Sequence, residues 1–130
     1  MIKILLVTSE KESFSEFATT LGKDEDVELS WSANGQEALE KISDNPVDLV
    51  AVNESIGDMT GIEFMKKLLM INPMINCAAV SSLSHEEFHE ASEGLGVLMQ
   101  LPVSPGEVEA KDLLKRLKNL KDLTVGIKRD

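Results

Sequence analysis

The sequence predicts an α/β fold in which a five-stranded parallel sheet is covered by helices on both faces. Short apolar runs of strand length recur along the chain, and segments with apolar residues at helical spacing lie between them. Each run is followed by such a segment, and this regular alternation is typical of parallel sheets. Right-handed crossovers then make a doubly wound, three-layer (βα)5 sandwich, for which the strand order 2-1-3-4-5 is a common small solution.

The expected strands are short and mostly apolar. The run Leu49-Val50-Ala51-Val52 has the length and composition of a strand buried on both faces. The second strand instead alternates apolar and polar residues with a period of two, which predicts one polar face. Strands are expected over residues 2–7, 27–32, 48–52, 75–80 and 97–101.

The helices between these strands follow from apolar stripes and from their end signals. Asn34-Gly35 is a turn or helix-start signal before the second helix, and Pro46 follows the end of that helix. In the last helix, we expect Leu113, Leu114, Leu117 and Leu120 to be buried. The helices are expected over residues 12–21, about 35–42, 61–70, 84–93 and 108–123.

Composition restricts the class of protein. The chain has 130 residues, enough for one core, and we expect a domain over residues 1–123 and a tail or the start of a linker over 124–130. The net charge of −10 argues against a direct nucleic-acid partner, which needs a basic face. No apolar run approaches the roughly 20 residues of a membrane span. The single cysteine, Cys77, cannot form an intrachain disulfide, so a cytoplasmic location is expected.

The candidate site lies at the carboxyl ends of the strands. In an open α/β sheet, ligands bind at this edge, near the switch point between the first and third strands. Asn53 directly follows the third strand and occupies the main functional position. The residues expected around this mouth are Thr8, Ser9, Glu10, Asn53, Ser81 and Leu101.

Four segments, in order, carry a resemblance to a known family. They are the first strand at 2–7, the strand, loop and helix start at 48–64, the turn around Gly94, and the Leu-Pro loop at 101–105. Together they resemble a CheY-like receiver domain of bacterial two-component response regulators. The resemblance covers about residues 2–123, and it implies a flavodoxin-like, CheY-like fold and a role in phosphorelay signal transduction.

The sequence departs from this family at most of the functional positions. In the family, two acidic residues after the first strand and an aspartate after the third hold Mg²⁺, and that aspartate accepts a phosphoryl group. A hydroxyl after the fourth strand and a lysine before the proline bind the phosphoryl oxygens. Here Thr8 and Ser9 replace the acidic pair, Asn53 the phosphoacceptor and Leu101 the lysine, whereas Ser81 retains the hydroxyl.

These replacements predict a degenerate receiver. An aspartyl phosphate needs a carboxylate nucleophile, and Mg²⁺ usually needs one or two carboxylate ligands. Glu10 alone predicts weak Mg²⁺ binding or none. We therefore expect a pseudo-receiver that is not an enzyme and needs no cofactor. It would act without aspartyl phosphorylation, through contacts with other signalling proteins or an output domain.

Two alternative functions come from other residues. His85-Glu86-Glu87-Phe88-His89 matches the H-E-x-x-H pattern of zinc hydrolases, although the chain has only 2 histidines. The second alternative is a small-ligand sensor that uses the neutral pocket around Ser9, Asn53 and Ser81.

Charges on the last two helices suggest an interaction surface. The fourth helix is rich in glutamate and the fifth in lysine and arginine, so a two-fold axis across them would pair acid with base twice. We expect a homodimer or partner docking through the fourth helix, fifth strand and fifth helix. The interface candidates are Glu86, Glu90, Glu93, Lys111, Lys115 and Arg116.

Overall fold

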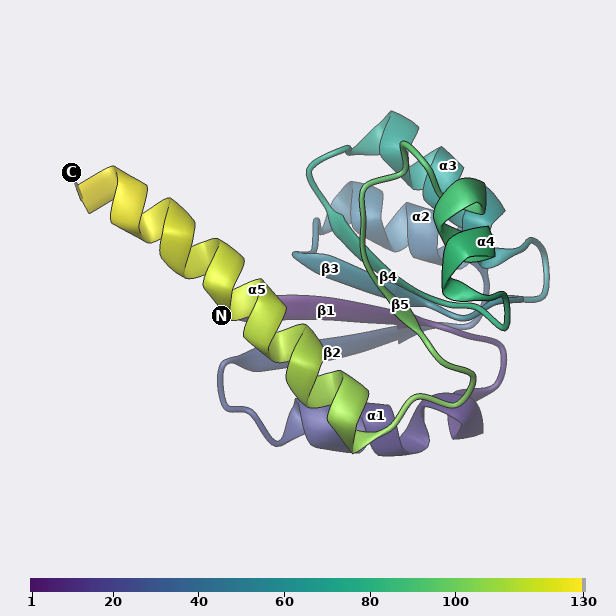
Figure 1. Ribbon diagram of the computed structural model, residues 1–130, viewed down its shortest axis with the longest axis horizontal. Coiled ribbons are helices and arrows are strands. Elements are labelled where there is room, and N and C mark those ends of the chain that lie inside the picture. The colour runs from purple at the N-terminus through teal and green to yellow at the C-terminus, as the bar shows by residue number, and fades with distance from the viewer. Residues whose placement is uncertain (130) are drawn as a thin grey trace.

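The protein has a five-stranded parallel sheet with the order β2-β1-β3-β4-β5, as predicted (Figure 1). The computed structural model describes the backbone of residues 1–129 and the side chains through residue 120. Each strand lies within one residue of its predicted bounds. The strands are β1 (Ile2–Val7), β2 (Val27–Ser32), β3 (Leu49–Val52), β4 (Asn76–Val80) and β5 (Val97–Leu101).

Helices cover both faces of the sheet (Figure 1). One core layer packs the sheet against α1 (Ser15–Gly22) and α5 (Glu107–Arg129). The other layer packs it against α2 (Gly35–Asp44), α3 (Gly61–Ile71) and α4 (His85–Ala91). All four residues of β3 are buried, as expected for a central strand covered on both faces.

The chain between β1 and α1 is tighter than the sequence predicts. A 3-10 helix, η1 (Lys11–Phe14), precedes α1 where one continuous helix was expected. Phe14 and Phe17 are fully buried, and their ring centroids lie 5.7 Å apart. The η1 turn brings Ser13 back towards the carboxyl end of β1, where it becomes part of the site described below.

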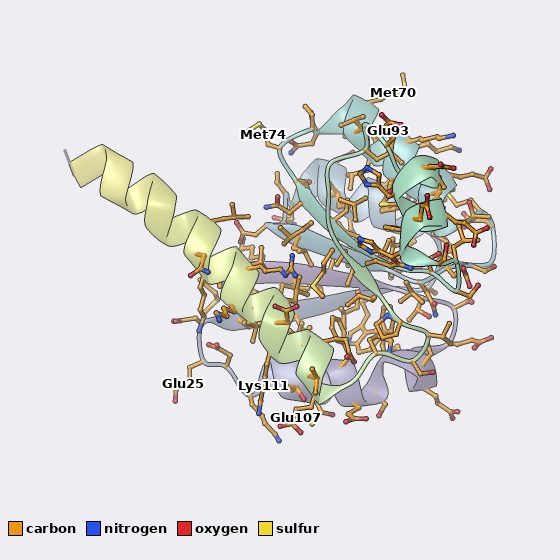
Figure 2. All side chains as sticks on the ribbon, in the orientation of Figure 1. Glu25, Met70, Met74, Glu93, Glu107 and Lys111 are labelled. Atoms are coloured by element: carbon orange, nitrogen blue, oxygen red, sulfur yellow. The ribbon has the colours of Figure 1, made fainter. Side chains whose placement is uncertain are left out.

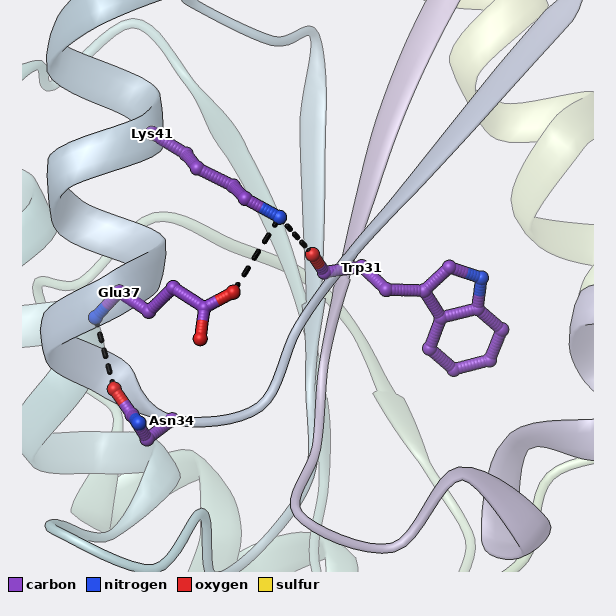
Figure 3. Close-up of polar contacts among 4 residues, drawn as sticks. All are labelled: Trp31, Asn34, Glu37 and Lys41. Carbon is purple, nitrogen blue, oxygen red and sulfur yellow. Dashed lines mark hydrogen bonds and ion pairs between the residues drawn. The ribbon is translucent and has the colours of Figure 1, made fainter.

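The start of α2 is held by two separate caps. Asn34 Oδ1 accepts a hydrogen bond from Glu37 N at 2.8 Å (Figure 3). Asp58, from the loop after β3, accepts hydrogen bonds from Gly35 N at 2.8 Å and Gln36 N at 3.0 Å. Lys41, one turn further along α2, contacts Glu37 and the carbonyl of Trp31 on β2 (Figure 3). These contacts fix α2 to the sheet and to the loop that carries the site.

Helices α3 and α4 both begin with a capping box, in which side chain and backbone satisfy each other reciprocally. Thr60 and Glu63 form the first, and Ser84 and Glu87 the second. Both caps lie in loops at the carboxyl edge of the sheet. They therefore set where the loops around the site end and the helices begin.

Helix α5 is longer than predicted. It continues to Arg129 and projects beyond the sheet (Figure 1). Most of the segment over 124–130, which was expected to be a tail or the start of a linker, is therefore helical. Leu113, Leu114 and Leu117 are buried, but Leu120 is 42% exposed, and its predicted burial is wrong because the helix has passed the sheet edge there. Within residues 1–129, no helix is long and apolar enough to cross a membrane.

Candidate functional site

The carboxyl ends of the strands bring side chains from four segments to one edge of the sheet. Thr8 follows β1, Asn53 follows β3 and Ser81 follows β4. Thr8 and Ser81 are buried, whereas Ser9 and Glu10 are exposed at the rim. Leu101, at the end of β5, is fully buried and belongs to the core beneath α1 and α5. Leu101 therefore supplies no polar group to the mouth of the site.

The amide of Asn53 bridges the loops after β1 and β3. Its Nδ2 donates hydrogen bonds to Thr8 Oγ1 at 2.9 Å and to Ser13 Oγ at 3.0 Å. Its Oδ1 accepts a hydrogen bond from Glu54 N at 2.8 Å. The side chain is therefore bonded through both ends, as expected for a partly buried amide.

The two hydroxyls that receive these hydrogen bonds have their own protons directed elsewhere. Thr8 Oγ1 donates to Glu10 O at 3.1 Å, and Ser13 Oγ donates to the same carbonyl at 2.8 Å. Each hydroxyl has only one proton to donate. In this arrangement both hydroxyls accept from residue 53, which suits an NH₂ group, whereas a carboxylate there has no proton to donate to them.

A carboxylate beside Asn53 connects β3 to the other side of the mouth. Glu54 Oε2 accepts hydrogen bonds from Ser82 N at 2.7 Å and Ser82 Oγ at 2.9 Å. Ser81 Oγ does not face an empty space but accepts a hydrogen bond from Leu83 N at 3.1 Å. The loop after β4 is thus held by hydrogen bonds within itself and by Glu54.

The loop after β4 is also tied to β5. Gln100 Nε2 donates a hydrogen bond to Leu83 O at 3.0 Å and a longer one to Ser81 O at 3.4 Å. A chain of internal hydrogen bonds therefore runs along the mouth, from the loop after β1 to β5. Its polar side chains bond to one another, which does not favour a small-ligand sensor built on Ser9, Asn53 and Ser81.

Comparison with known proteins identifies the family. A family model described as the response regulator receiver domain matches residues 4–104. This chain belongs to the response regulator receiver family. Receiver domains are in general non-enzymatic signalling domains that contact other signalling proteins or output domains.

Solved structures share the receiver fold at low sequence identity. The chemotaxis response regulator CheY4 of Vibrio cholerae is 23% identical with a TM-score of 0.78, over 90% of this chain and 98% of that one. The response regulator domain of Thermotoga maritima CheB is 20% identical with a TM-score of 0.76, over 92% of this chain and 95% of that one. The N-terminal domain of WS1339 from Wolinella succinogenes is 16% identical with a TM-score of 0.80, over 95% of this chain and 99% of that one. No curated protein matches the sequence.

The histidine pair of this receiver domain lies away from the mouth. His85 and His89 are on α4 and line a groove with Asp112 and Arg116 of α5. Among the described residues, no three His, Cys, Asp or Glu side chains are placed to hold a metal ion. The H-E-x-x-H pattern therefore lacks a third ligand, and a zinc hydrolase is not favoured.

The charged interface candidates of the receiver domain are divided between two regions. Glu86 and Glu90 lie on α4, whereas Glu93 lies in the turn after it, because α4 ends at Ala91. Lys111 pairs with Glu107 at 2.6 Å, and Arg116 pairs with Asp112 at 3.3 Å. Lys115 is exposed. Glu93 and Lys111 are far apart in Figure 2, so the six candidates do not form one compact patch.

Three residues of the site were not predicted from the sequence to belong to it. Ser13 was expected only as a helix residue, and its role depends on the η1 turn. Ser82 and Gln100 reach the mouth through contacts with partners 28 and 17 positions away. The adjacent hydroxyls of Ser81 and Ser82 are the one pattern that could have indicated a polar loop there.

Proposed function

We propose that this chain is a pseudo-receiver, a cytoplasmic signalling module that works by protein–protein contact without aspartyl phosphorylation. It acts on other signalling proteins or on an output domain, and it requires neither Mg²⁺ nor catalysis. Family membership supports the signalling role, and the free, buried thiol of Cys77 is consistent with the cytoplasm.

The observation that carries this proposal is the hydrogen bonding of Asn53. Its amide donates to Thr8 and Ser13, and both hydroxyls have their protons directed to Glu10 O. An amide is not a nucleophile that can form an acyl phosphate. The same network leaves no carboxylate pair next to Asn53 that would hold Mg²⁺ in the usual way. The nearest acid in the chain, Glu54, is bonded to Ser82.

Treatment with a small phosphodonor tests the proposal. The protein is incubated with acetyl phosphate and Mg²⁺, and separately with beryllofluoride and Mg²⁺. Intact-mass spectrometry should show no added phosphoryl group, and the amide resonances around Asn53 should not shift. Saturable phosphorylation of the wild-type protein would refute the proposal.

The Asn53→Asp variant serves as the matched control for this experiment. It restores the nucleophile but neither the acidic pair at Thr8 and Ser9 nor the lysine at Leu101. We expect it to remain unmodified under the same conditions. If this single change restored phosphorylation, the residues at Thr8, Ser9 and Leu101 would not contribute to the absence of phosphorylation in the wild-type protein.

We also propose that the docking surface is the groove between α4, β5 and α5. It has a volume of about 370 Å³ and is lined by both apolar and polar side chains. The same helices carry Glu86 and Glu90 on α4 and the exposed Lys115 on α5, so a second copy related by a two-fold axis would place acid against base. The lining includes His85, Phe88, His89, Met99, Asp112 and Arg116.

A further inference from the structure

Glu54 is a carboxylate placed across the mouth of the pseudo-receiver pocket. It follows Asn53 in the loop after β3, and its Oε2 reaches Ser82 in the loop after β4. The two donors converge on one oxygen, from Ser82 N at 2.7 Å and Ser82 Oγ at 2.9 Å. Hydrogen bonds to an ionised acceptor are shorter and about twice as strong as neutral ones. This contact therefore joins two loops that the backbone connects only through α3 and β4.

The contact fixes the beginning of α4. Ser84, two residues after Ser82, is the N-cap of α4 and forms its capping box with Glu87. Leu83, between them, donates its N–H to Ser81 Oγ. With Ser82 held by Glu54, each residue from Ser81 to Ser84 has a defined hydrogen-bond partner. The position of the first turn of α4 follows from these bonds.

The same loop leads to the proposed docking groove. Gln100 of β5 donates to Leu83 O at 3.0 Å and is also one of the residues that line the groove. His85 and Phe88, in the first turns of α4, line it as well. The path from Glu54 to the groove is therefore continuous through Ser82, Leu83 and Gln100.

We propose that the Glu54 carboxylate is an internal anionic ligand of the mouth. It occupies the Ser82 N–H and hydroxyl donors that an external oxyanion would otherwise bind, and it holds the loop after β4 and the groove in a single arrangement. This inference rests on the proposed function. A module that is not switched by phosphorylation needs some other contact to hold its docking surface in one conformation.

Amide hydrogen exchange measured by NMR tests the contact directly. The proteins compared are the wild type, Glu54→Ala, Glu54→Gln and Glu25→Gln. Glu25 is an exposed glutamate in the loop before β2, far from the mouth, and serves as the matched control (Figure 2). In Glu54→Ala, the Ser82 amide should exchange at least about 10-fold faster, because it loses a charge-assisted hydrogen bond.

The remaining variants separate an anionic ligand from simple packing. Glu54→Gln keeps an oxygen of similar position without the charge, so its Ser82 amide should exchange at an intermediate rate, and Glu25→Gln should behave as the wild type. Resonances of Leu83 and Gln100 should shift in both Glu54 variants. Adding sodium acetate to Glu54→Ala should move the Ser82 amide resonance back towards its wild-type position, with no response in the wild type.

Two results would overturn the inference. An unchanged exchange rate at Ser82 in Glu54→Ala would show that the carboxylate does not hold the loop. No response of Ser82 to acetate in that variant would show that the site does not accept an anion. Both outcomes are independent of the phosphodonor experiment, so the pseudo-receiver proposal could stand while the role of Glu54 fails, or the reverse.

Discussion

The hydrogen-bond partners of Asn53 determine which type of side chain suits position 53. Both amide protons bind hydroxyl lone pairs, on Thr8 and Ser13, and the amide oxygen binds Glu54 N. A carboxylate of the same shape has no proton to donate, so the two hydroxyls would have to turn their own protons from Glu10 O towards it. Buried groups without a matching partner cost free energy. The hydrogen bonds of this site are therefore matched to an amide at position 53.

The first prediction concerns the stability of Asn53→Asp. We expect this change to lower the free energy of unfolding at pH 7 by about 1–3 kcal/mol, because the new carboxylate loses both hydrogen bonds that the NH₂ group donates. Urea denaturation followed by circular dichroism measures the difference. Asn119→Asp, at an exposed position on α5, is the control and should change stability by less than about 0.5 kcal/mol. Equal stability of Asn53→Asp and the wild type would contradict the hydroxyl orientation described above.

Cys77 gives a second prediction about a single side chain. It lies in β4, is buried, and its burial raises the pKa of the thiol to about 12. At pH 8 only about one thiol in 10⁴ would then be ionised, and the thiolate is the reactive form. We expect no reaction of the native protein with a coloured thiol reagent within minutes, and complete reaction in 6 M guanidinium, a denaturing concentration. Rapid labelling of the native protein would mean that β4 opens readily.

Loops and helix starts form the next level of organisation. Each helix on the α2–α3–α4 face begins with a side-chain cap, from Asn34, Thr60 and Ser84. Asp58 adds a cap from a different loop, because it binds Gly35 N and Gln36 N across 23 and 22 positions. Met59 packs over Gly35, where a Cβ atom would lie 2.6 Å from Met59 Sδ. The loop that carries Asn53 and Glu54 is thus clamped to α2.

The third prediction tests this clamp through its pH dependence. Hydrogen bonds from Gly35 N and then Gln36 N lower the pKa of Asp58 below its ordinary value of 3.8. A carboxyl whose folded-state pKa is lowered contributes stability that is present above the ordinary pKa and is lost as the pH falls through the lowered one. We expect Asp58→Asn to lower Tm at pH 7 by about 2–5 °C.

The difference in Tm between Asp58→Asn and the wild type should narrow as the pH falls below 3.8. Thermal melts from pH 7 to pH 2 measure it. Asp44→Asn, at an exposed position near the end of α2, is the control and should show no such convergence. A difference in Tm that is independent of pH would exclude the ionised carboxylate as the cap.

At the scale of the whole molecule, a groove lies on the face formed by α4, β5 and α5. The groove runs between α4, β5 and α5, and β5 is an edge strand of the sheet. Its α5 rim carries the Arg116–Asp112 pair, while Lys111 is turned to Glu107 and Lys118 to Asp24. Fewer basic groups are therefore available for a partner than the sequence indicates, and exposed pairs contribute little individually.

The fourth prediction concerns self-association through this face. We expect sedimentation velocity to show a concentration-dependent dimer at 20 mM salt that weakens at 500 mM salt, because exposed charges are screened. Glu90→Lys on α4 should weaken the dimer, whereas Glu25→Lys, the same charge change far from the groove, should not. A monomer at both salt concentrations would exclude the homodimer and leave a different protein as the partner.

Local patterns in the sequence determined the secondary structure and the fold. Strand positions and the two-sided cover of helices follow from apolar periodicity, which depends on residues a few positions apart. The sheet order was predicted as the common solution for such an alternation, and it is confirmed. The neutral residues at the expected pocket positions were also readable, but only by comparison with the receiver family that the sequence resembles. The 3-10 turn before α1 and the continuation of α5 were not, since both depend on how the chain packs against or leaves the sheet.

The tertiary structure alone decided which polar groups meet at the mouth. Ser13 reaches Asn53 across 40 positions, Glu54 reaches Ser82 across 28, and Gln100 reaches Leu83 across 17. Such pairs depend on the paths of separate loops, and no spacing rule within one helix or strand encodes them. The sequence therefore placed neutral side chains at the positions where the family resemblance predicts acids and a lysine, and the fold decided which of the polar ones hydrogen-bond to one another.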